Sequence, residues 1–143
     1  MRIAKIEWRR FLPIENPRSG MSFSRVIDIS QKIKKLIRKE NLDYVSLIQH
    51  GESFIVWDGH GRTSAYILQG RLLVPSAILE TDEDLRRTLD DKSDNQTGIK
   101  GFLEEYLTVI APELEQYGIK SFADYPVVQE LARRQNREIM RGR

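Results

Sequence analysis

The residues best suited to chemistry in this chain form the short segment Asp58-Gly59-His60-Gly61-Arg62. It follows an apolar run, residues 54–57, that is typical of a buried strand, and it precedes a stretch with helical character. Glycines let backbone N–H groups approach a ligand closely. The first N–H groups of a helix have no partner within the helix and are suited to binding phosphate. The spacing therefore predicts an anion site where a strand turns into a helix.

Side chains at the same place could add to such a site. Arg62 offers a forked, charged donor, and Thr63 and Ser64 supply hydroxyls in the first helical turn. Histidine ordinarily titrates near neutral pH, so His60 could act as an acid or base. It could equally make one hydrogen bond to a phosphate or a backbone carbonyl. Two plainer interpretations stay open: the glycines can form an ordinary tight turn, and Arg62 can pair with an acidic neighbour.

The surrounding elements must position this segment. Strands are expected over residues 3–11, 44–48, 54–57 and 72–79, with a hairpin turn at residues 50–52. Pro75 favours an edge position or a strand start. Helices are expected over residues 29–41, 63–69, 82–89 and 101–110, the second ended by Gly70 and the last by Pro112, with another from residue 126 to the end. This order predicts an α+β core, residues 1–80, and a helical C-terminal extension, residues 81–143, that packs on or beside it.

Composition limits the class of protein. The chain has 143 residues, of which 40% are hydrophobic, as expected for a single domain with one core. The absence of cysteine excludes disulfides, thiolate metal sites and cysteine nucleophiles. No apolar run approaches the roughly 18 residues that would span a membrane, and the charged N-terminus is unlike a secretory signal. We therefore expect a cytoplasmic protein with no membrane partner.

Basic residues gather in two stretches although the net charge is only +2. The expected helix over residues 29–41 carries one stretch, the C-terminus carries the other, and an acidic stretch lies between them. Such a pattern could present a basic face to DNA, and its candidate contacts are Arg18, Lys32, Lys35 and Lys39. The alternative is a pair of amphipathic helices with solvated basic faces. The C-terminal helices could pair two copies into a homodimer or pack within one chain.

The motif resembles the signature of the ParB/sulfiredoxin superfamily. In that superfamily a Gly-x-x-Arg turn precedes a helix, and a glycine and a Val-Pro or Ile-Pro strand follow, as Gly70 and Val74-Pro75 do here. Asn16-Pro17-Arg18 and Ser93-Asp94-Asn95-Gln96 match further family segments in the same order. The resemblance covers roughly residues 3 to 100. It implies a nucleotide-binding α+β fold with a small mixed sheet.

The resemblance also implies roles for particular residues. Gly59, Gly61 and Arg62 would contact the phosphates of a nucleoside di- or triphosphate such as CTP, ATP or ADP. Asp94 and Asn95 correspond to a Glu-Asn pair that helps to hold Mg²⁺, which prefers hard oxygen ligands, although the same two residues also favour turns. Sulfiredoxin chemistry is excluded, because that enzyme needs a cysteine where this chain has His60.

A further branch of the superfamily, the free-serine kinases, carries Asp-Gly-His-His-Arg and an upstream catalytic glutamate. Glu15 lies in the corresponding loop here, so it could act as a general base on a hydroxyl, or it could be a solvated loop residue. Gly61 stands where those kinases have a second histidine, which puts kinase activity in doubt and leaves the phosphate turn intact.

Three functions follow from the sequence. The first is a ParB-like nucleotide-binding protein, with nucleotide hydrolysis or an activity on DNA; too little chain follows residue 100 for the DNA-reading and dimerisation region of a chromosome-partition protein. The second is an ADP- or ATP-dependent small-molecule kinase with Glu15 as base and Arg62 on the moving phosphoryl group. The third is a non-catalytic interaction protein in which the turn holds no ligand.

Overall fold

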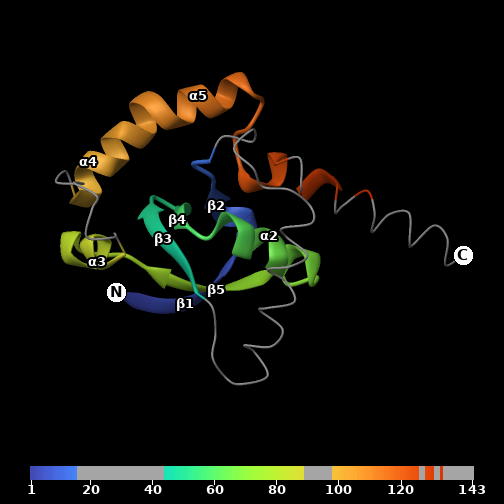
Figure 1. The fold of residues 1–143 in the computed structure, drawn as a ribbon, viewed down its shortest axis with the longest axis horizontal. Coiled ribbons are helices and arrows are strands. Elements are labelled where there is room, and N and C mark those ends of the chain that lie inside the picture. The colour runs from blue at the N-terminus through green and yellow to red at the C-terminus, as the bar shows by residue number, and fades with distance from the viewer. Residues whose placement is uncertain (16–43, 89–97, 126–127, 131–132, 134–143) are drawn as a thin grey trace, which may run out of the picture.

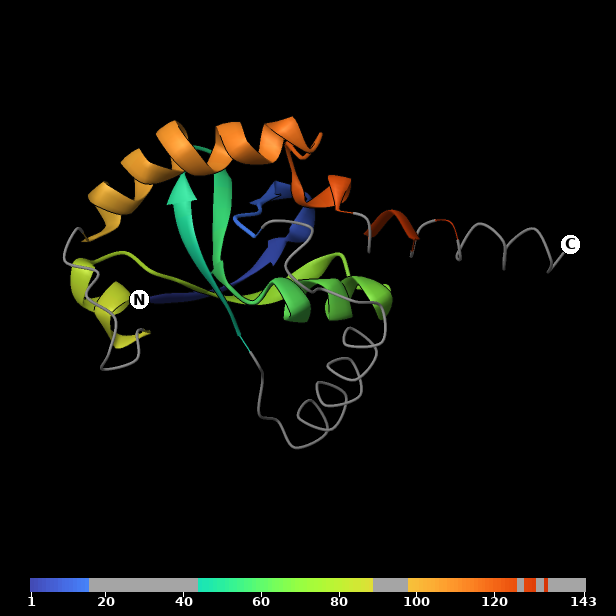
Figure 2. The same cartoon turned by 45° about the horizontal axis from the view of Figure 1, so that its top comes forward.

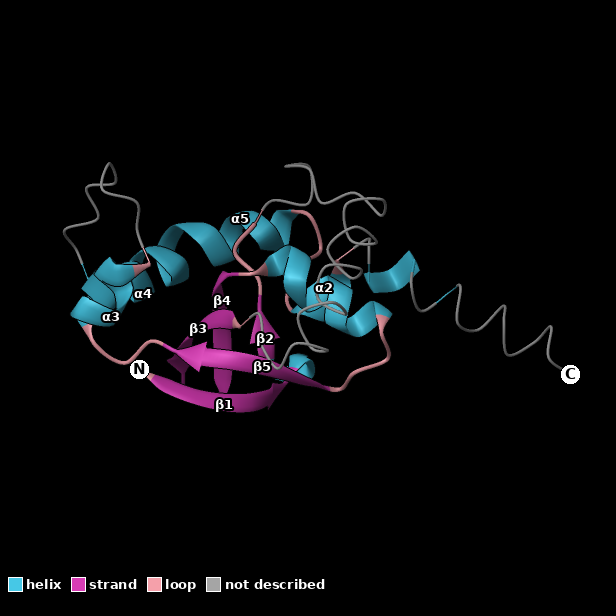
Figure 3. Ribbon diagram, turned by 60° about the horizontal axis from the view of Figure 1, so that its bottom comes forward, coloured by secondary structure: helices cyan, strands magenta, loops and turns pink. Residues whose placement is uncertain are grey.

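A mixed sheet of five strands forms the centre of the chain in this computed structural model, which describes residues 1–15, 44–88, 98–125, 128–130 and 133 (Figure 1). The strands are β1 (Arg2–Glu7), β2 (Phe11–Leu12), β3 (Val45–His50), β4 (Ser53–Asp58) and β5 (Leu73–Ile78). They lie side by side in the order β1-β5-β3-β4-β2 (Figure 3). The pairs β1–β5 and β3–β4 are antiparallel, and the pairs β3–β5 and β2–β4 are parallel. The predicted α+β class with a small mixed sheet is confirmed.

Helices flank this sheet. They are α2 (His60–Leu68), α3 (Asp82–Arg87), α4 (Gly98–Glu105), the π-helical segment η2 (Tyr106–Ile110) and α5 (Ala111–Gln116), with 3-10 turns η1 (Trp8–Arg10) and η3 (Phe122–Asp124). Figure 2 shows the run α4–η2–α5 crossing the β3–β4 hairpin. Successive side chains of a strand face opposite sides. Accordingly, Phe54 and Val56 of β4 join one apolar cluster while Ile55 joins another.

Both clusters draw on the chain after residue 80. Leu114 and Phe122 are buried in the cluster that contains Tyr66 of α2. Phe102 and Tyr106 are buried in the cluster that contains Ile55. The helices after residue 80 therefore pack on the sheet and share its two cores.

Several boundaries differ from those predicted. The strand expected over residues 3–11 is divided by η1 into β1 and β2. The hairpin turn and the helix over residues 82–89 lie where they were expected. Gly70 ends α2 as predicted, with φ of 75° and the Arg71 N–H bonded to the Tyr66 carbonyl at 3.1 Å.

None of the helices in the described part of the chain has the length and the apolar character that a membrane-spanning helix requires.

The prediction for Pro75 is wrong, because β5 is an interior strand and Pro75 is its third residue. Pairing with β3 begins only at Ser76, opposite Val45. The Leu79 N–H donates to the Leu47 carbonyl, so strand alternation directs the N–H positions of residues 77 and 75 toward β3 as well. Pro75 has no N–H to donate to β3, and it lies just before the first residue of β5 that pairs with β3.

The prediction that Pro112 ends a helix is also wrong, because the chain stays helical from α4 through α5. Proline cannot donate to the carbonyl four residues earlier and crowds it. The π-helical segment η2 resolves this conflict: the Ala111 N–H donates to the Tyr106 carbonyl, one residue further back than in an α-helix. The widened turn carries Pro112 inside a continuous helical run.

Candidate phosphate-binding site

The turn between β4 and α2 depends on Gly59. This residue caps the helix with φ of 118° and ψ of 31°, a left-handed conformation that side chains rarely adopt. A Cβ built there would lie 3.1 Å and 3.2 Å from the two γ-carbons of Val45 and 3.3 Å from its Cα. Glycine is required at this position both for the left-handed backbone conformation and for the close approach to Val45 of β3.

The start of α2 presents backbone donors. The first helical bond runs from the Thr63 N–H to the Gly59 carbonyl at 2.8 Å. The N–H groups of His60, Gly61 and Arg62 precede it, so helix geometry gives them no acceptor within the helix. Gly59 has no side chain, and the helix has no side-chain cap. The predicted combination of a glycine turn and a helix start is therefore present, and α2 begins at His60 rather than at Thr63.

The two hydroxyls of the first turn hydrogen-bond to backbone carbonyls of the same turn. Thr63 Oγ1 donates to the Gly59 carbonyl at 2.9 Å, and Ser64 Oγ donates to the His60 carbonyl at 3.0 Å. Both residues are fully buried. Both hydroxyls thus bond to carbonyls of the first turn of the helix, and a phosphate contact by either of them stays a prediction.

Arg62 lies at the junction of β3, β4 and α2. Its guanidinium donates to the Tyr44 carbonyl at 2.8 Å, and its other terminal nitrogen lies 3.7 Å from an Asp58 carboxylate oxygen. The Asp58 side chain is 63% exposed and that of Arg62 is 31% exposed. The acidic-neighbour interpretation of Arg62 is thus realised, and the guanidinium remains partly open to solvent beside the helix start.

His60 is buried, with only 3% of its surface exposed. Its Nε2 accepts a hydrogen bond from the Ile14 N–H at 3.0 Å, and its ring stacks on Phe122 with centroids 5.8 Å apart. Burial lowers the pKa of His60 from 6.5 to about 4, so the ring is neutral at physiological pH. A neutral ring that accepts at Nε2 carries its proton on Nδ1. Its lone pair is already used, so His60 is poorly placed to act as the base itself.

Glu15 is the second predicted catalytic residue, and the structure brings it to His60. A Glu15 carboxylate oxygen lies 3.7 Å from His60 Nδ1, and the side chain is 49% exposed. The segment 13–15 is anchored on both sides of this carboxylate, because Ile14 bonds to His60 and the Glu15 carbonyl accepts a hydrogen bond from the Tyr125 hydroxyl. The result is an anchored, half-exposed carboxylate beside the start of α2.

The sequence did not single out three residues that shape this site. Tyr125 anchors Glu15 from 110 positions away, Tyr44 accepts from Arg62, and Phe122 covers the His60 ring. No local spacing marks them, since each makes its contact across the fold. The only hint in the sequence was the aromatic character of Phe122 and Tyr125, which is equally typical of residues that pack in a hydrophobic core.

Other predicted site residues lie outside the described part of the chain. They are the DNA-contact candidates Arg18, Lys32, Lys35 and Lys39 and the magnesium candidates Asp94 and Asn95. Within the described residues, no group of three or more histidine or acidic side chains could hold a metal ion. Binding of DNA and of Mg²⁺ therefore stays a prediction.

No protein-family model matches the sequence. No curated protein matches it either. Among solved structures the chain is similar to the crystal structure of sulfiredoxin from Arabidopsis thaliana, with 19% sequence identity, 63% of this chain and 99% of that chain covered, and a TM-score of 0.45. Likeness at this level carries no argument, so the function is argued from the geometry of the site.

Proposed function

We propose that this chain binds a nucleoside di- or triphosphate, with CTP, ATP and ADP as candidates, through its phosphate groups at the start of α2. The observation that carries the proposal is the left-handed Gly59, which begins the helix without a side-chain cap. The backbone donors of the first turn and the positive end of the helix dipole then favour an anion at this point.

Arg62 supports the same proposal. A guanidinium has five N–H donors, and the bond of one of them to the Tyr44 carbonyl fixes the place of the Arg62 charge beside the helix start. Asp58 lies at 3.7 Å, longer than a hydrogen bond, and is mostly exposed. In the proposal a phosphate replaces this carboxylate as the anion beside Arg62, which gives a charged and forked contact next to the backbone donors.

Nucleotide binding is expected to stabilise the folded chain. A nucleotide at 100 times its dissociation constant should raise the free energy of unfolding by about 2.7 kcal/mol. A thermal-shift panel of CTP, ATP, ADP and GTP, with and without Mg²⁺, measures this. Arg62→Gln removes the charge and the forked donor, so it should weaken binding about tenfold or more.

The matched control is Arg71→Gln, which removes the same charge just beyond the other end of α2. It should leave nucleotide affinity unchanged. If no nucleotide stabilises the protein, the proposal fails and the non-catalytic interaction protein is favoured. Equal weakening by both arginine substitutions would mean that bulk charge, and not this site, attracts the nucleotide.

A second candidate function is a phosphotransferase in which Glu15 is the general base, and the anchoring of Glu15 beside His60 favours it. A hydroxyl compound near the helix start would pass its proton to the Glu15 carboxylate as its oxygen attacks the terminal phosphorus. The nucleotide then leaves with the electrons of the broken P–O bond. A general base needs reach more than a special pKa. His60 would act as a positioning residue, with Nδ1–H directed at Glu15.

Transfer of phosphate from ATP or ADP to a small hydroxyl compound such as serine tests this candidate. Glu15→Gln should lower the rate by about a hundredfold or more with nucleotide affinity kept, because it removes only the base. Tyr125→Phe removes the anchor and keeps the carboxylate, so it should cost about tenfold. Glu113→Gln, an exposed change on α5, is the control. Full activity in Glu15→Gln would rule out the base.

A further inference from the structure

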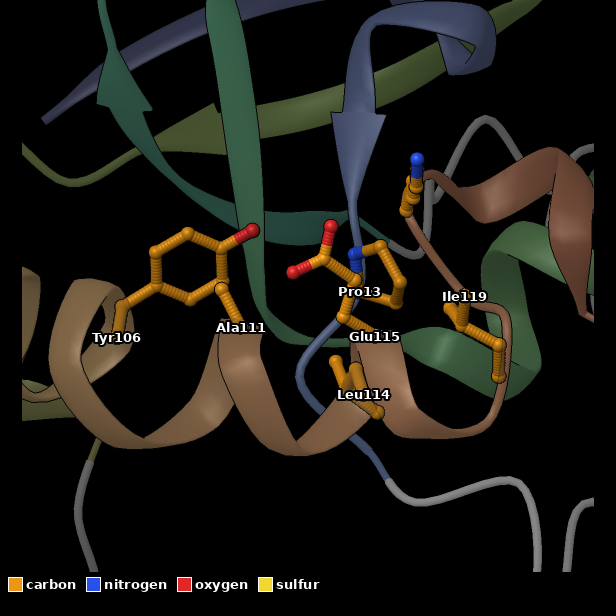
Figure 4. Close-up of a pocket in the computed structure, with 7 residues that line it drawn as sticks. Pro13, Tyr106, Ala111, Leu114, Glu115 and Ile119 are labelled. Atoms are coloured by element: carbon orange, nitrogen blue, oxygen red, sulfur yellow. The ribbon is translucent and has the colours of Figure 1, made fainter.

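A cavity of about 240 Å³ lies between residue 13 and the helical run after residue 105, away from the turn at Gly59 (Figure 4). The phosphate turn contributes nothing to its wall. Its lining comes from the segment after β2, from η2 and α5, and from the chain just beyond them; the residues are Pro13, Tyr106, Ala111, Leu114, Glu115, Ile119 and Lys120. The phosphate-binding proposal leaves this cavity without a role.

The local fold explains why a hollow forms here. The π-helical segment η2 widens the helix by one residue at Tyr106. Gly118, with φ of 75°, then turns the chain at the end of α5, where the Ile119 N–H bonds to the Leu114 carbonyl at 3.1 Å. The turn brings residues 119 and 120 back to the same space that the widened helix opens.

One wall of the cavity is apolar and buried. Leu114 and Ile119 are each 4% exposed, and Pro13 is also buried. A short hydrocarbon chain placed against these three side chains would leave water, which favours binding. The volume limits such a ligand to a molecule smaller than an ordinary drug.

Polar groups face the same space. Tyr106 is 6% exposed, and within the described chain its hydroxyl has no hydrogen-bond partner. Figure 4 shows this hydroxyl and the Glu115 carboxylate directed into the space beside Pro13. Burial raises the pKa of Tyr106, so its hydroxyl stays neutral and can both donate and accept.

The cavity lining also carries one acidic and one basic side chain. Glu115 and Lys120 both line the cavity, and among the described residues neither forms an ion pair within 4.0 Å, with each other or with another side chain. The hydroxyl of a mostly buried tyrosine and two solvent-exposed opposite charges surround an apolar wall, and a small charged ligand would pair with all three.

We propose that this cavity binds a small zwitterion whose ammonium and carboxylate are separated by a short hydrocarbon chain. The ammonium meets the Glu115 carboxylate and the Tyr106 oxygen. The hydrocarbon lies on Pro13, Leu114 and Ile119, and the carboxylate meets Lys120. Each polar group of the ligand thereby pairs with a side chain that has no other ion pair or hydrogen bond in the described chain.

The test uses 6-aminohexanoate as the probe, followed by NMR of the ¹⁵N-labelled chain. Saturable shifts are expected at residues 111, 114, 119 and 120, with a dissociation constant on the order of 1 mM for so small a ligand. Hexylamine and hexanoate each lack one charge and should bind about fivefold more weakly. Shifts that do not saturate, or equal binding of either single-charge analogue, would overturn the proposal.

Two substitutions and a control complete the test. Glu115→Gln should weaken the probe about fivefold, as expected for an exposed ion pair. Tyr106→Phe should weaken it without loss of stability, because the hydroxyl has no partner in the described chain. Glu113→Gln removes the same charge from α5 outside the cavity and should change nothing. Unaltered binding in Glu115→Gln and Tyr106→Phe would mean that the probe binds elsewhere.

Discussion

Lowering the pH is expected to destabilise the folded chain across the interval in which an ordinary histidine becomes charged. Burial lowers the pKa of His60 from 6.5 to about 4. Between these values the unfolded chain binds a proton at His60 that the folded chain does not, so the free energy of unfolding falls as the pH falls. The contribution is complete above pH 6.5. Its loss over the whole interval amounts to about 3 kcal/mol.

Two features of the site act on this pKa in opposite directions. Protonating Nε2 would remove the acceptor of the Ile14 N–H, which adds to the cost of charging a buried ring. The Glu15 carboxylate, 3.7 Å from Nδ1, would favour the charged ring. Glu15 is half exposed, so solvent screens its charge, and the effect of burial is larger.

Urea unfolding in steps from about pH 7 to about pH 4.5 measures the effect. This range stays above the one where Asp84 loses its contribution, because the hydrogen bond with the N-terminal amine lowers the pKa of Asp84 to about 2. His60→Gln can still accept from the Ile14 N–H and does not titrate, so its stability should vary much less with pH. His50→Gln, in the hairpin, is the matched control. A slope that persists in His60→Gln would contradict the prediction.

Local signals were sufficient for the strand, turn and helix that carry the candidate site. The apolar residues of β4, the glycine at position 59 and the glycine at position 70 each act within a few residues, and α2 lies between the two glycines. The helix still starts earlier than its pattern predicted. Gly59 supplies a left-handed cap, so His60 and Gly61 enter the first turn even though neither residue type favours a helix.

Contacts between distant segments could not be predicted in the same way. The proximity of Glu15 and His60 depends on the parallel pairing of β2 with β4, which aligns Phe11 with Phe54 and carries the following residues past the helix start. Tyr125 reaches Glu15 only because the chain after α5 returns to the core. At Pro112 the opposite occurred, because the local sequence predicted a helix end and the π-helical segment η2 allowed the helix to continue.

Replacing Gly59 by alanine is expected to lower the free energy of unfolding by about 3 kcal/mol, as the sum of backbone strain and crowding. The residue has φ of 118°, and the new Cβ would approach Val45 to between 3.1 Å and 3.3 Å. One of the three contacts is with the Val45 Cα, so a side-chain rotation alone cannot relieve them. Val45 is fully buried and paired with Ser76, which leaves β3 little room to move. Urea unfolding of the purified variant measures the loss.

Gly51→Ala gives the cost of an ordinary left-handed residue without crowding, because Gly51 has a φ of 61° and a Cβ there would meet nothing within 4 Å. It should cost about 1 kcal/mol, the penalty for the backbone alone. Equal losses in the two variants would show that β3 yields to the new methyl group. A larger loss at Gly59 shows that its wider φ of 118° and its approach to Val45 together require glycine, whether or not a nucleotide binds. The charge of Arg62 is therefore the part of the site whose removal reports on the ligand.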